Sequence, residues 1–152
     1  MEYKPTLFIV STPIGNWEDI TLRAINTLKS ADVIICEEYR VASTLLKKLE
    51  IPKKELLSVN EHNEKEETAE IIQRILLGEN MALISDCGTP VFADPGHYLI
   101  NQAVDFGIDV IPVPGASSLM ATLSILNFKL DQFYFAGFLP REKQERARAL
   151  NQ

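Results

Sequence analysis

The sequence predicts an α/β domain with a mostly parallel five-stranded sheet and helices on both faces. Two observations predict this fold class. Five short apolar runs alternate with segments in which apolar residues recur every three or four positions. The runs themselves are nearly continuous in apolar residues, which is typical of parallel strands that are covered on both faces.

The predicted elements follow one another in regular order along the chain. The predicted strands cover residues 7–10, 33–36, 56–59, 81–84 and 109–113. The helical patterns between and after them centre on residues 22–28, 45–49, 71–76, 99–104 and 119–126. Repeated strand–helix units with short connections predict neighbouring parallel strands.

Several predicted helix ends carry capping signals. Asn63 followed by Glu66 resembles a capping box at the start of the third helix. Asp94 and Pro95 predict an N-cap and a first-turn proline for the fourth helix, and Ser117 predicts an N-cap for the fifth. These signals predict where the helices begin.

The end of the chain follows a different pattern. Residues 133–138 alternate in polarity and predict a final strand or an extended exit from the domain. A break at Leu139 and Pro140 precedes a charged segment that predicts one more helix. We therefore expect one domain over residues 1–138 and the start of a linker helix over residues 139–152.

Composition excludes several classes of protein. The 152 residues are 46% hydrophobic and 24% charged, which is typical of a folded globular chain. No apolar run approaches the roughly 20 residues that cross a bilayer, so we expect no membrane association and a cytoplasmic location. Two widely spaced cysteines, Cys36 and Cys87, predict neither a disulfide scaffold nor a metal site.

Charge argues against non-specific binding of nucleic acid. The formal net charge is −6, whereas neutralising phosphates requires clustered Lys and Arg. Acidic residues cluster in residues 61–70, which hold five of the 21, and residues 141–150 are locally basic. Binding of RNA through a localised contact therefore remains an alternative.

Polar stretches rich in Gly and Pro follow the predicted strands and precede the helices. They are STPIGNWED at 11–19, EEYR at 37–40, NEHNE at 60–64, SDCGTPVFADPG at 85–96 and PGASS at 114–118. In an open parallel sheet these loops lie together at the carboxyl ends of the strands, where ligands bind. Neither GxGxxG nor GxxxxGK[ST] is present, which disfavours a nucleotide phosphate. A compact ligand held by main-chain groups, such as adenosine with an amino-acid tail, fits better.

Five long motifs in this order are similar to one known family. They are STPIGNWEDITLRA at 11–24, EHNE at 61–64, SDCGTPVFADPG at 85–96, PGASS at 114–118 and FAGFLPR at 135–141. Together they resemble the N-terminal domain of the ribosomal RNA small subunit methyltransferase I branch of the tetrapyrrole methylase superfamily. The match extends over residues 7–141, and the ordered series of motifs makes it specific.

The resemblance implies an S-adenosyl-L-methionine-dependent methyltransferase with a tetrapyrrole-methylase-like fold. It implies 2′-O-methylation of a cytidine ribose in the decoding region of small-subunit ribosomal RNA, with the assembled subunit as substrate. It also implies a homodimer. In that superfamily the cofactor lies between two domains, so residues 139–152 would begin the interdomain helix and the second domain is absent from this chain.

The resemblance also implies which loops contact the cofactor. Carried over to this sequence, the cofactor-binding residues are Pro13, Ile14, Asp86, Gly88, Thr89, Ser117 and Ser118. The chain departs from the family after the second strand. Glu37-Glu38-Tyr39-Arg40 stands where the family reads Glu-Asp-Thr-Arg, so the acid and the arginine remain but a phenol lies between them.

Methyl transfer to a ribose hydroxyl is an in-line displacement, and a general base helps by removing the hydroxyl proton. The candidate bases near the strand ends are Glu37, Glu38, His62 and Glu64. Arg40 is a candidate for holding a phosphate, and Trp17 or Tyr39 for stacking on a base.

Structural roles compete with each of these assignments. His62 and Glu64 stand where a helix begins and suit a cap or the helix dipole. Arg40 has an ion pair with Glu37 or Glu38 as its alternative, and Trp17 has simple packing. Two other functions also stay open: methylation of a tetrapyrrole or another small molecule, and a truncated half-domain without catalytic activity.

Overall fold

A single parallel sheet organises the chain. The computed structural model describes residues 4–91 and 94–151. Its strands are β1 (Thr6–Val10), β2 (Val33–Cys36), β3 (Glu55–Ser58), β4 (Met81–Ile84) and β5 (Asp109–Val113). They pair in the order β3-β2-β4-β1-β5, and every pairing is parallel. The predicted five-stranded parallel sheet is therefore confirmed.

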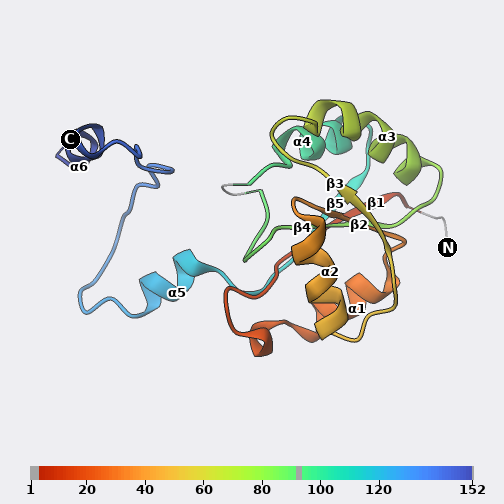
Figure 1. Cartoon of the computed structure of the whole chain (residues 1–152), viewed down its shortest axis with the longest axis horizontal. Helices are drawn as coiled ribbons and strands as arrows, with labels where there is room; N and C mark the ends of the chain where they lie inside the picture. The colour runs from red at the N-terminus through yellow and green to blue at the C-terminus, as the bar shows by residue number, and fades with distance from the viewer. Residues whose placement is uncertain (1–3, 92–93, 152) are drawn as a thin grey trace.

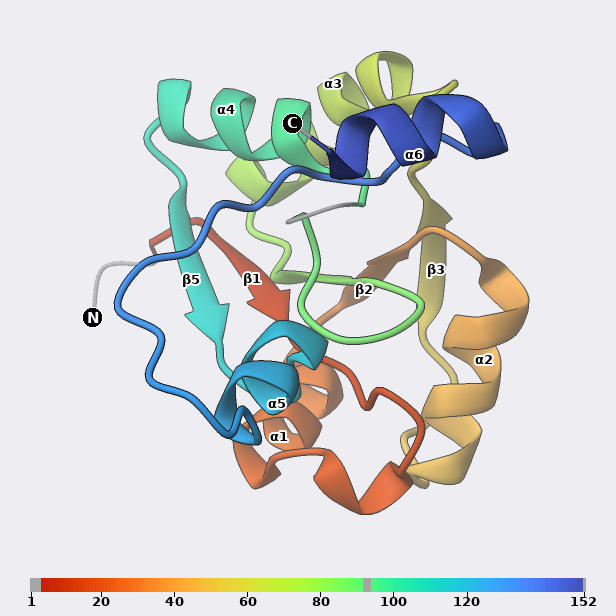
Figure 2. The same cartoon turned by 90° about the vertical axis from the view of Figure 1, so that its left-hand side faces the viewer.

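Helices cover both faces of this sheet, as predicted. The helices are η1 (Trp17–Asp19), α1 (Leu22–Ser30), α2 (Tyr39–Lys48), α3 (Glu64–Leu76), α4 (His97–Asp105), α5 (Ser118–Ser124) and α6 (Lys143–Leu150). Figures 1 and 2 show α3 and α4 on one face and α1 and α2 on the other.

Two apolar clusters fill the space between sheet and helices. On one face Ile71 and Leu99 pack against strand residues such as Leu7. On the other face, Leu28 and Leu45 pack against the strand residues that alternate with the first set. Alternate side chains of the same strands thus enter opposite clusters, which is why the strands read as unbroken apolar runs.

The beginnings of two helices differ from the prediction. Asn63 precedes α3, but its amide donates to the Ser58 carbonyl at 2.8 Å and its Oδ1 accepts from the Asn60 N–H at 2.7 Å. The expected capping box is wrong, because the Asn63 side chain is used to close the preceding turn. The start of α4 is also not capped by Asp94 with Pro95 in its first turn, since this helix begins at His97 after Gly96.

The cap of α4 comes from α3 instead. Oε1 of Glu64 accepts the backbone N–H groups of Gly96 and Tyr98, each at 2.9 Å. A carboxylate at this position satisfies orphan donors and faces the positive end of the helix. The prediction for Ser117 is confirmed, since its Oγ accepts from the Met120 N–H at 3.3 Å at the start of α5.

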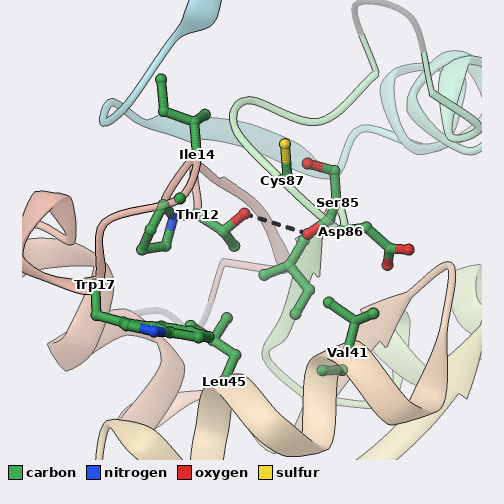
Figure 3. Close-up of a pocket in the computed structure, with 12 residues that line it drawn as sticks. Thr12, Ile14, Trp17, Val41, Leu45, Ser85, Asp86 and Cys87 are labelled. Carbon is green, nitrogen blue, oxygen red and sulfur yellow. Dashed lines mark hydrogen bonds between the residues drawn. The ribbon is translucent and has the colours of Figure 1, made fainter.

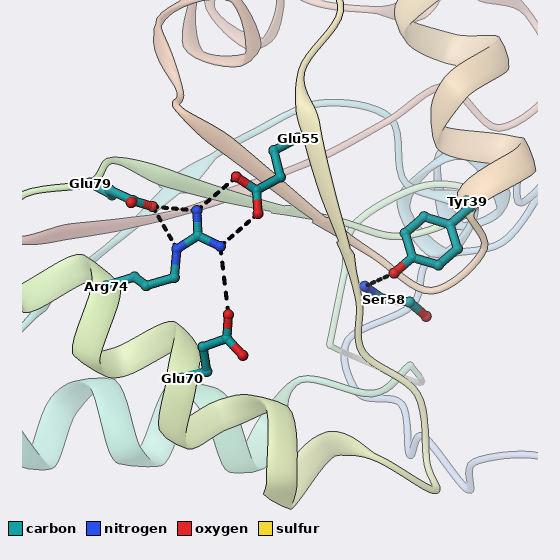
Figure 4. A network of polar contacts seen from close by, with 6 residues as sticks. All are labelled: Tyr39, Glu55, Ser58, Glu70, Arg74 and Glu79. Atoms are coloured by element: carbon teal, nitrogen blue, oxygen red, sulfur yellow. Dashed lines mark hydrogen bonds and ion pairs between the residues drawn. The ribbon is translucent and has the colours of Figure 1, made fainter.

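The edge strand β3 is held by side chains from both helical layers (Figure 4). The Arg74 guanidinium contacts both carboxylate oxygens of Glu55, at 2.7 and 2.8 Å, and the Glu79 carboxylate at 2.8 Å. At the other end of the strand, the Ser58 N–H donates to the Tyr39 hydroxyl at 3.2 Å. Tyr39, the departure from the family pattern, therefore binds an edge N–H that the ladder leaves open.

The chain beyond β5 has a different character, and we call residues 114–151 the C-terminal arm. None of its residues is buried. Figure 1 shows it leading away from the α/β body through α5 to α6. Residues 133–138 form no strand, so the extended exit, and not the final strand, is what the structure contains.

Candidate functional site

The loops after β1, β4 and β5 meet at the carboxyl edge of the sheet. Thr12 and Gly88 exchange backbone hydrogen bonds, with N···O distances of 2.8 and 3.2 Å. The Ser11 N–H donates to the Val113 carbonyl at 3.2 Å. Because β1 lies between β4 and β5, its loop is joined to both neighbours.

Two buried hydroxyl groups, of Ser11 and Thr12, and the exposed hydroxyl of Thr89 strengthen this junction. Ser11 Oγ lies 2.9 Å from Thr89 Oγ1, and the Thr89 hydroxyl donates to the Ala116 carbonyl at 3.3 Å. The Thr12 hydroxyl donates to the Ser85 carbonyl at 3.2 Å. Of these hydroxyl residues only Thr89 was predicted. The signal for the others was the pair of hydroxyl residues that directly follows the first strand.

Two glycines let the loops approach closely. A Cβ on Gly88 would lie 3.2 Å from Ile14 Cγ2, and its φ of +84° favours glycine. A Cβ on Gly115 would lie 2.9 Å from the Ser11 Cβ. Larger residues would therefore push the three loops apart.

Two adjoining pockets open at this junction. The first, which we call the Trp17 pocket, has a volume of about 310 Å³ and lies between the β1 loop, the β4 loop and α2. Figure 3 shows Leu45 of α2 beside the Trp17 indole and Val41 of the same helix on the side of Asp86, with Thr12 hydrogen-bonded to Ser85 across from them. Its lining is mainly apolar, and Asp86 supplies a carboxylate.

The second pocket, the Ser117 pocket, is larger at about 540 Å³. It lies between the β4 loop, α5 and the C-terminal arm, and Cys87 lines both pockets. Its polar lining consists largely of hydroxyl groups, and Phe135 and Phe138 of the arm supply aromatic surface. Among the described residues no Lys or Arg lines either pocket.

Comparison with known families identifies the fold. The sequence model of the Tetrapyrrole (Corrin/Porphyrin) Methylases matches residues 6–152. The chain belongs to this tetrapyrrole methylase family.

Relatives within the family are similar over nearly the whole chain. A protein of Mesorhizobium japonicum named "Ribosomal RNA small subunit methyltransferase I" is 45% identical over 137 residues, which cover 90% of this chain and 46% of that protein. Proteins of the same name from Halalkalibacterium halodurans and Thermotoga maritima are 44% and 46% identical, covering 98% and 92% of this chain and 51% and 63% of their own lengths. The chain thus spans about half the length of the curated relatives it matches.

Solved structures show the same tetrapyrrole methylase fold. The crystal structure of uroporphyrin-III-C-methyltransferase from Thermus thermophilus is 25% identical with a TM-score of 0.61, covering 85% of this chain and 55% of that chain. A diphthine synthase structure, 18% identical with a TM-score of 0.62 over 78% of this chain and 47% of that chain, shares the fold alone.

The predicted cofactor-binding residues of this tetrapyrrole methylase are divided between the two pockets. Pro13, Ile14 and Asp86 line the Trp17 pocket. Gly88, Thr89, Ser117 and Ser118 line the Ser117 pocket. The structure thus brings all seven to one edge of the sheet but into two neighbouring cavities, a division that the motifs did not predict.

The predicted catalytic residues are more widely spread. Glu37 lines a small crevice beside Ser85 and Asp94, next to the pockets. Glu64 is engaged in capping α4, His62 is exposed, and neither lines either pocket. Arg40 is exposed on the first turn of α2, and no ion pair joins it to Glu37 or Glu38 in the part of the chain that the structure describes.

Carboxyl groups make this edge of the sheet electronegative. Partial burial raises the pKa of Glu37, and the neighbouring carboxylates of Asp86 and Asp94 raise it further. Burial also raises the pKa of Asp86, although a hydrogen bond from the Glu38 backbone opposes the shift. Burial raises the pKa of Asp94 against a hydrogen bond with Ser85. Such a site favours a cationic ligand over an anionic one.

Neither a metal site nor a membrane span is found in the described residues. No group of three or more His, Cys, Asp or Glu side chains in residues 4–91 and 94–151 is placed to hold a metal ion. Within the same ranges, no helix has the length and apolar character needed to cross a bilayer.

Proposed function

We propose that this chain is the cofactor-binding part of an S-adenosyl-L-methionine-dependent methyltransferase that acts on small-subunit ribosomal RNA. The main support for this proposal is the pair of adjoining pockets at the carboxyl edge of the sheet, which share Cys87. A transferase needs a donor and an acceptor in neighbouring cavities, so that the reacting atoms meet at the boundary.

The residues present fit this cofactor. S-adenosyl-L-methionine supplies, when bound, an electrophilic methyl group on a positively charged sulfur. Thr89, Ser117 and Ser118 would hold its polar groups in the Ser117 pocket. The nearby carboxyl groups suit a cation, and the lack of Lys and Arg among the described lining residues suits a ligand without phosphate.

For the acceptor we propose the 2′-hydroxyl of a cytidine in the decoding region. The O2′–CH3 bond forms as the S–CH3 bond breaks, and the hydroxyl proton passes to a base. Of the predicted bases, Glu37 fits best, because it lies at the carboxyl end of β2 and its pKa is raised toward the working range of a base. Arg40 would contact a backbone phosphate from the exposed first turn of α2.

The sequence identities to the relatives favour RNA over a tetrapyrrole as substrate. Proteins named as ribosomal RNA methyltransferases are 44% to 46% identical to this chain, against 25% for the uroporphyrin-III-C-methyltransferase. Side chains at a site diverge when the substrate changes, so the nearer relatives are the better guide.

The same proposal includes a longer, dimeric, cytoplasmic enzyme. Residues 1–138 would form the cofactor domain and residues 139–152 would lead through α6 to a second domain. Large apolar side chains of the arm, including Tyr134 at 90% exposed and Phe138 at 85%, would be covered in the homodimer or by that domain. Sedimentation of the chain at rising concentration measures its self-association, and a monomer throughout would contradict a dimer formed by this part alone.

Calorimetric titration with S-adenosyl-L-methionine and with S-adenosylhomocysteine tests the cofactor assignment. Ser118→Ala removes a hydroxyl from the Ser117 pocket and should weaken binding by roughly two- to tenfold, the value of one hydrogen bond. Ser124→Ala is the matched control, because its hydroxyl lies in the same helix but bonds Ala121 and does not line the pocket. If the wild-type chain bound neither compound, the cofactor assignment would be contradicted.

Transfer of a labelled methyl group tests the acceptor. Small ribosomal subunits incubated with the protein and labelled cofactor should yield labelled 2′-O-methylcytidine after nuclease digestion. Label on a base, or on another nucleotide, would contradict the proposed acceptor and leave the cofactor assignment standing.

A further inference from the structure

The Trp17 pocket holds Pro13, Ile14 and Asp86, which the family resemblance assigns to the cofactor, beside an indole ring and aliphatic side chains to which that resemblance gives no role. Its lining combines an indole ring, the aliphatic groups of Val41, Leu45 and Ile84, and one carboxylate from Asp86. Apolar walls with a single polar group are typical of sites for small flat ligands. With a volume of about 310 Å³, the pocket is smaller than its neighbour.

The walls of this pocket are preformed. The hydrogen bond from Thr12 to Ser85 joins its two loops, and Gly88 allows Ile14 to lie close to the β4 loop. The Lys48 ammonium lies 5.7 Å from the centroid of the Trp17 ring, which holds the indole over α2. Trp17 is nevertheless 42% exposed, so the ring is available to a ligand and is not a core side chain.

The chemistry selects among possible ligands. No Lys or Arg in the described chain lines the pocket, so a phosphate or carboxylate has no counterion there. An aromatic ring stacks on indole, and a carboxylate accepts a hydrogen bond from an exocyclic amine, as Asp does from N4 of cytosine. A neutral heteroaromatic ring that carries an amino group can stack on the Trp17 indole and donate a hydrogen bond to the Asp86 carboxylate.

We propose that the Trp17 pocket binds the nucleobase of the acceptor nucleotide, turned out of the RNA, while the cofactor occupies the Ser117 pocket. Trp17 stacks on the base and Asp86 accepts its exocyclic amine, so a cytosine is preferred over a uracil. The two pockets meet at Cys87, which places the ribose of a base bound in one beside a methyl donor bound in the other. This inference rests on the proposed function and adds the specificity-determining residues of the same site.

The chain carries its own probe for this pocket. Trp17 is the only tryptophan of the 152 residues, so its indole N–H gives one identifiable resonance in a nitrogen–proton correlation spectrum. Millimolar binding is detected by such shifts. We would titrate the chain, saturated with S-adenosylhomocysteine, with cytidine and separately with uridine. We expect a saturable shift of the indole resonance with cytidine and at least severalfold weaker binding of uridine.

Two matched substitutions separate a filled pocket from a damaged fold. Val41→Phe places a ring in the pocket from the surface of α2 and should abolish the cytidine response, with S-adenosylhomocysteine binding unchanged. Val104→Phe makes the same change at an exposed position of α4, outside both pockets, and should leave both ligands unaffected. Asp86→Asn keeps the shape of the carboxylate, adds an amide donor, and should reduce the preference for cytidine over uridine by roughly tenfold.

The outcomes distinguish this inference from the proposed function. Binding of S-adenosylhomocysteine without any indole shift on adding cytidine would overturn the base pocket and leave the methyltransferase assignment intact. Loss of S-adenosylhomocysteine binding in Val41→Phe, with Val104→Phe normal, would also overturn it, because the cofactor would then occupy the Trp17 pocket. Failure of the wild-type chain to bind S-adenosylhomocysteine at all would defeat both proposals together.

Discussion

The α/β body and the C-terminal arm of this chain differ in how far they bury their side chains. The body, residues 4–113, contains every buried residue of the described chain and two complete apolar clusters. The arm is as rich in large apolar side chains, yet it buries none of them. Local helix formation, as in α5 and α6, therefore does not require a core, whereas a defined position in space does.

The two pockets differ in the same way, because only one of them is lined by residues of the arm. The Trp17 pocket is lined entirely by the body, and hydrogen bonds between its loops fix its shape. The Ser117 pocket takes part of its lining from the arm. We therefore expect the acceptor side to be formed in this chain by itself, and the cofactor side to tighten when the arm is covered.

The largest expected effect is on the body's core. Leu28→Ala should lower the free energy of unfolding by about 2–5 kcal/mol, because the side chain is fully buried and leaves a cavity. Ile125→Ala in the arm, where the side chain is 81% exposed, should change it by less than about 0.5 kcal/mol. Urea unfolding followed by circular dichroism measures both. Equal losses would mean that the arm packs against the body in solution.

Glycine substitutions give the next largest contrast. Gly96→Ala introduces a Cβ 2.9 Å from Leu83 Cδ2 at a φ of +123°, so strain and a clash with a core residue combine. We expect a loss of about 2–3 kcal/mol. Gly137→Ala in the arm has a φ of +73° and no atom within 4 Å of the new Cβ, so its cost should stay near 1 kcal/mol or below. A milder effect at Gly96 than at Gly137 would refute the assigned role of the close contact.

Removal of the Glu64 cap should have an intermediate effect. Glu64→Ala leaves the N–H groups of Gly96 and Tyr98 without their partner and should cost about 1 kcal/mol. Glu66→Ala, at an exposed position of the same turn, is the control. Thermal unfolding measures the loss, and methyl transfer per folded molecule measures any catalytic part. A large loss of transfer with unchanged stability would restore Glu64 as a catalytic residue.

The smallest effect is a pH dependence of stability. The folded pKa of Glu37 is raised above its usual 4.5, so its contribution to stability is present below the unfolded pKa and is lost as pH rises through the folded pKa. Glu37→Gln should therefore be slightly more stable than wild type near neutral pH, with the difference vanishing in acid. Unfolding midpoints measured across this range provide the check.

Glu55 offers a control of opposite sign. The Arg74 guanidinium lowers the pKa of Glu55, so its stabilisation is present above the unfolded pKa and is lost as pH falls through the folded pKa. Glu55→Gln should thus be slightly less stable than wild type near neutral pH. If both variants shifted in the same direction, the assigned electrostatics of the carboxyl edge would be wrong.

Local patterns were sufficient for most of the fold. The predicted strands at residues 33–36, 81–84 and 109–113 coincide with β2, β4 and β5. The prediction at 7–10 begins one residue after β1, and the prediction at 56–59 is shifted by one residue along β3. Such agreement is expected, because periodicity and turn residues act within a few positions of the chain. The same is true of the Ser117 cap, whose partner lies three residues away.

Contacts distant in sequence account for what was not predicted. The cap of α4 was assigned to Asp94, but it comes from Glu64, 32 residues before the first N–H that it accepts. The amide of Asn63 was expected to cap its own helix and instead closes a turn with Ser58. A local rule cannot weigh a partner whose distance depends on how α3 packs on α4.

Short-range patterns in the sequence are enough to predict the parallel α/β class, the five strands and the position of the polar loops at their carboxyl ends. The strand order, in which β1 lies between β4 and β5, follows from tertiary packing. That order brings Thr12 to Gly88 and Ser11 to Thr89, and so divides the site into two pockets. Pairing between distant strands is chosen by the packing of whole layers, a sum over the entire core that no single stretch of sequence contains.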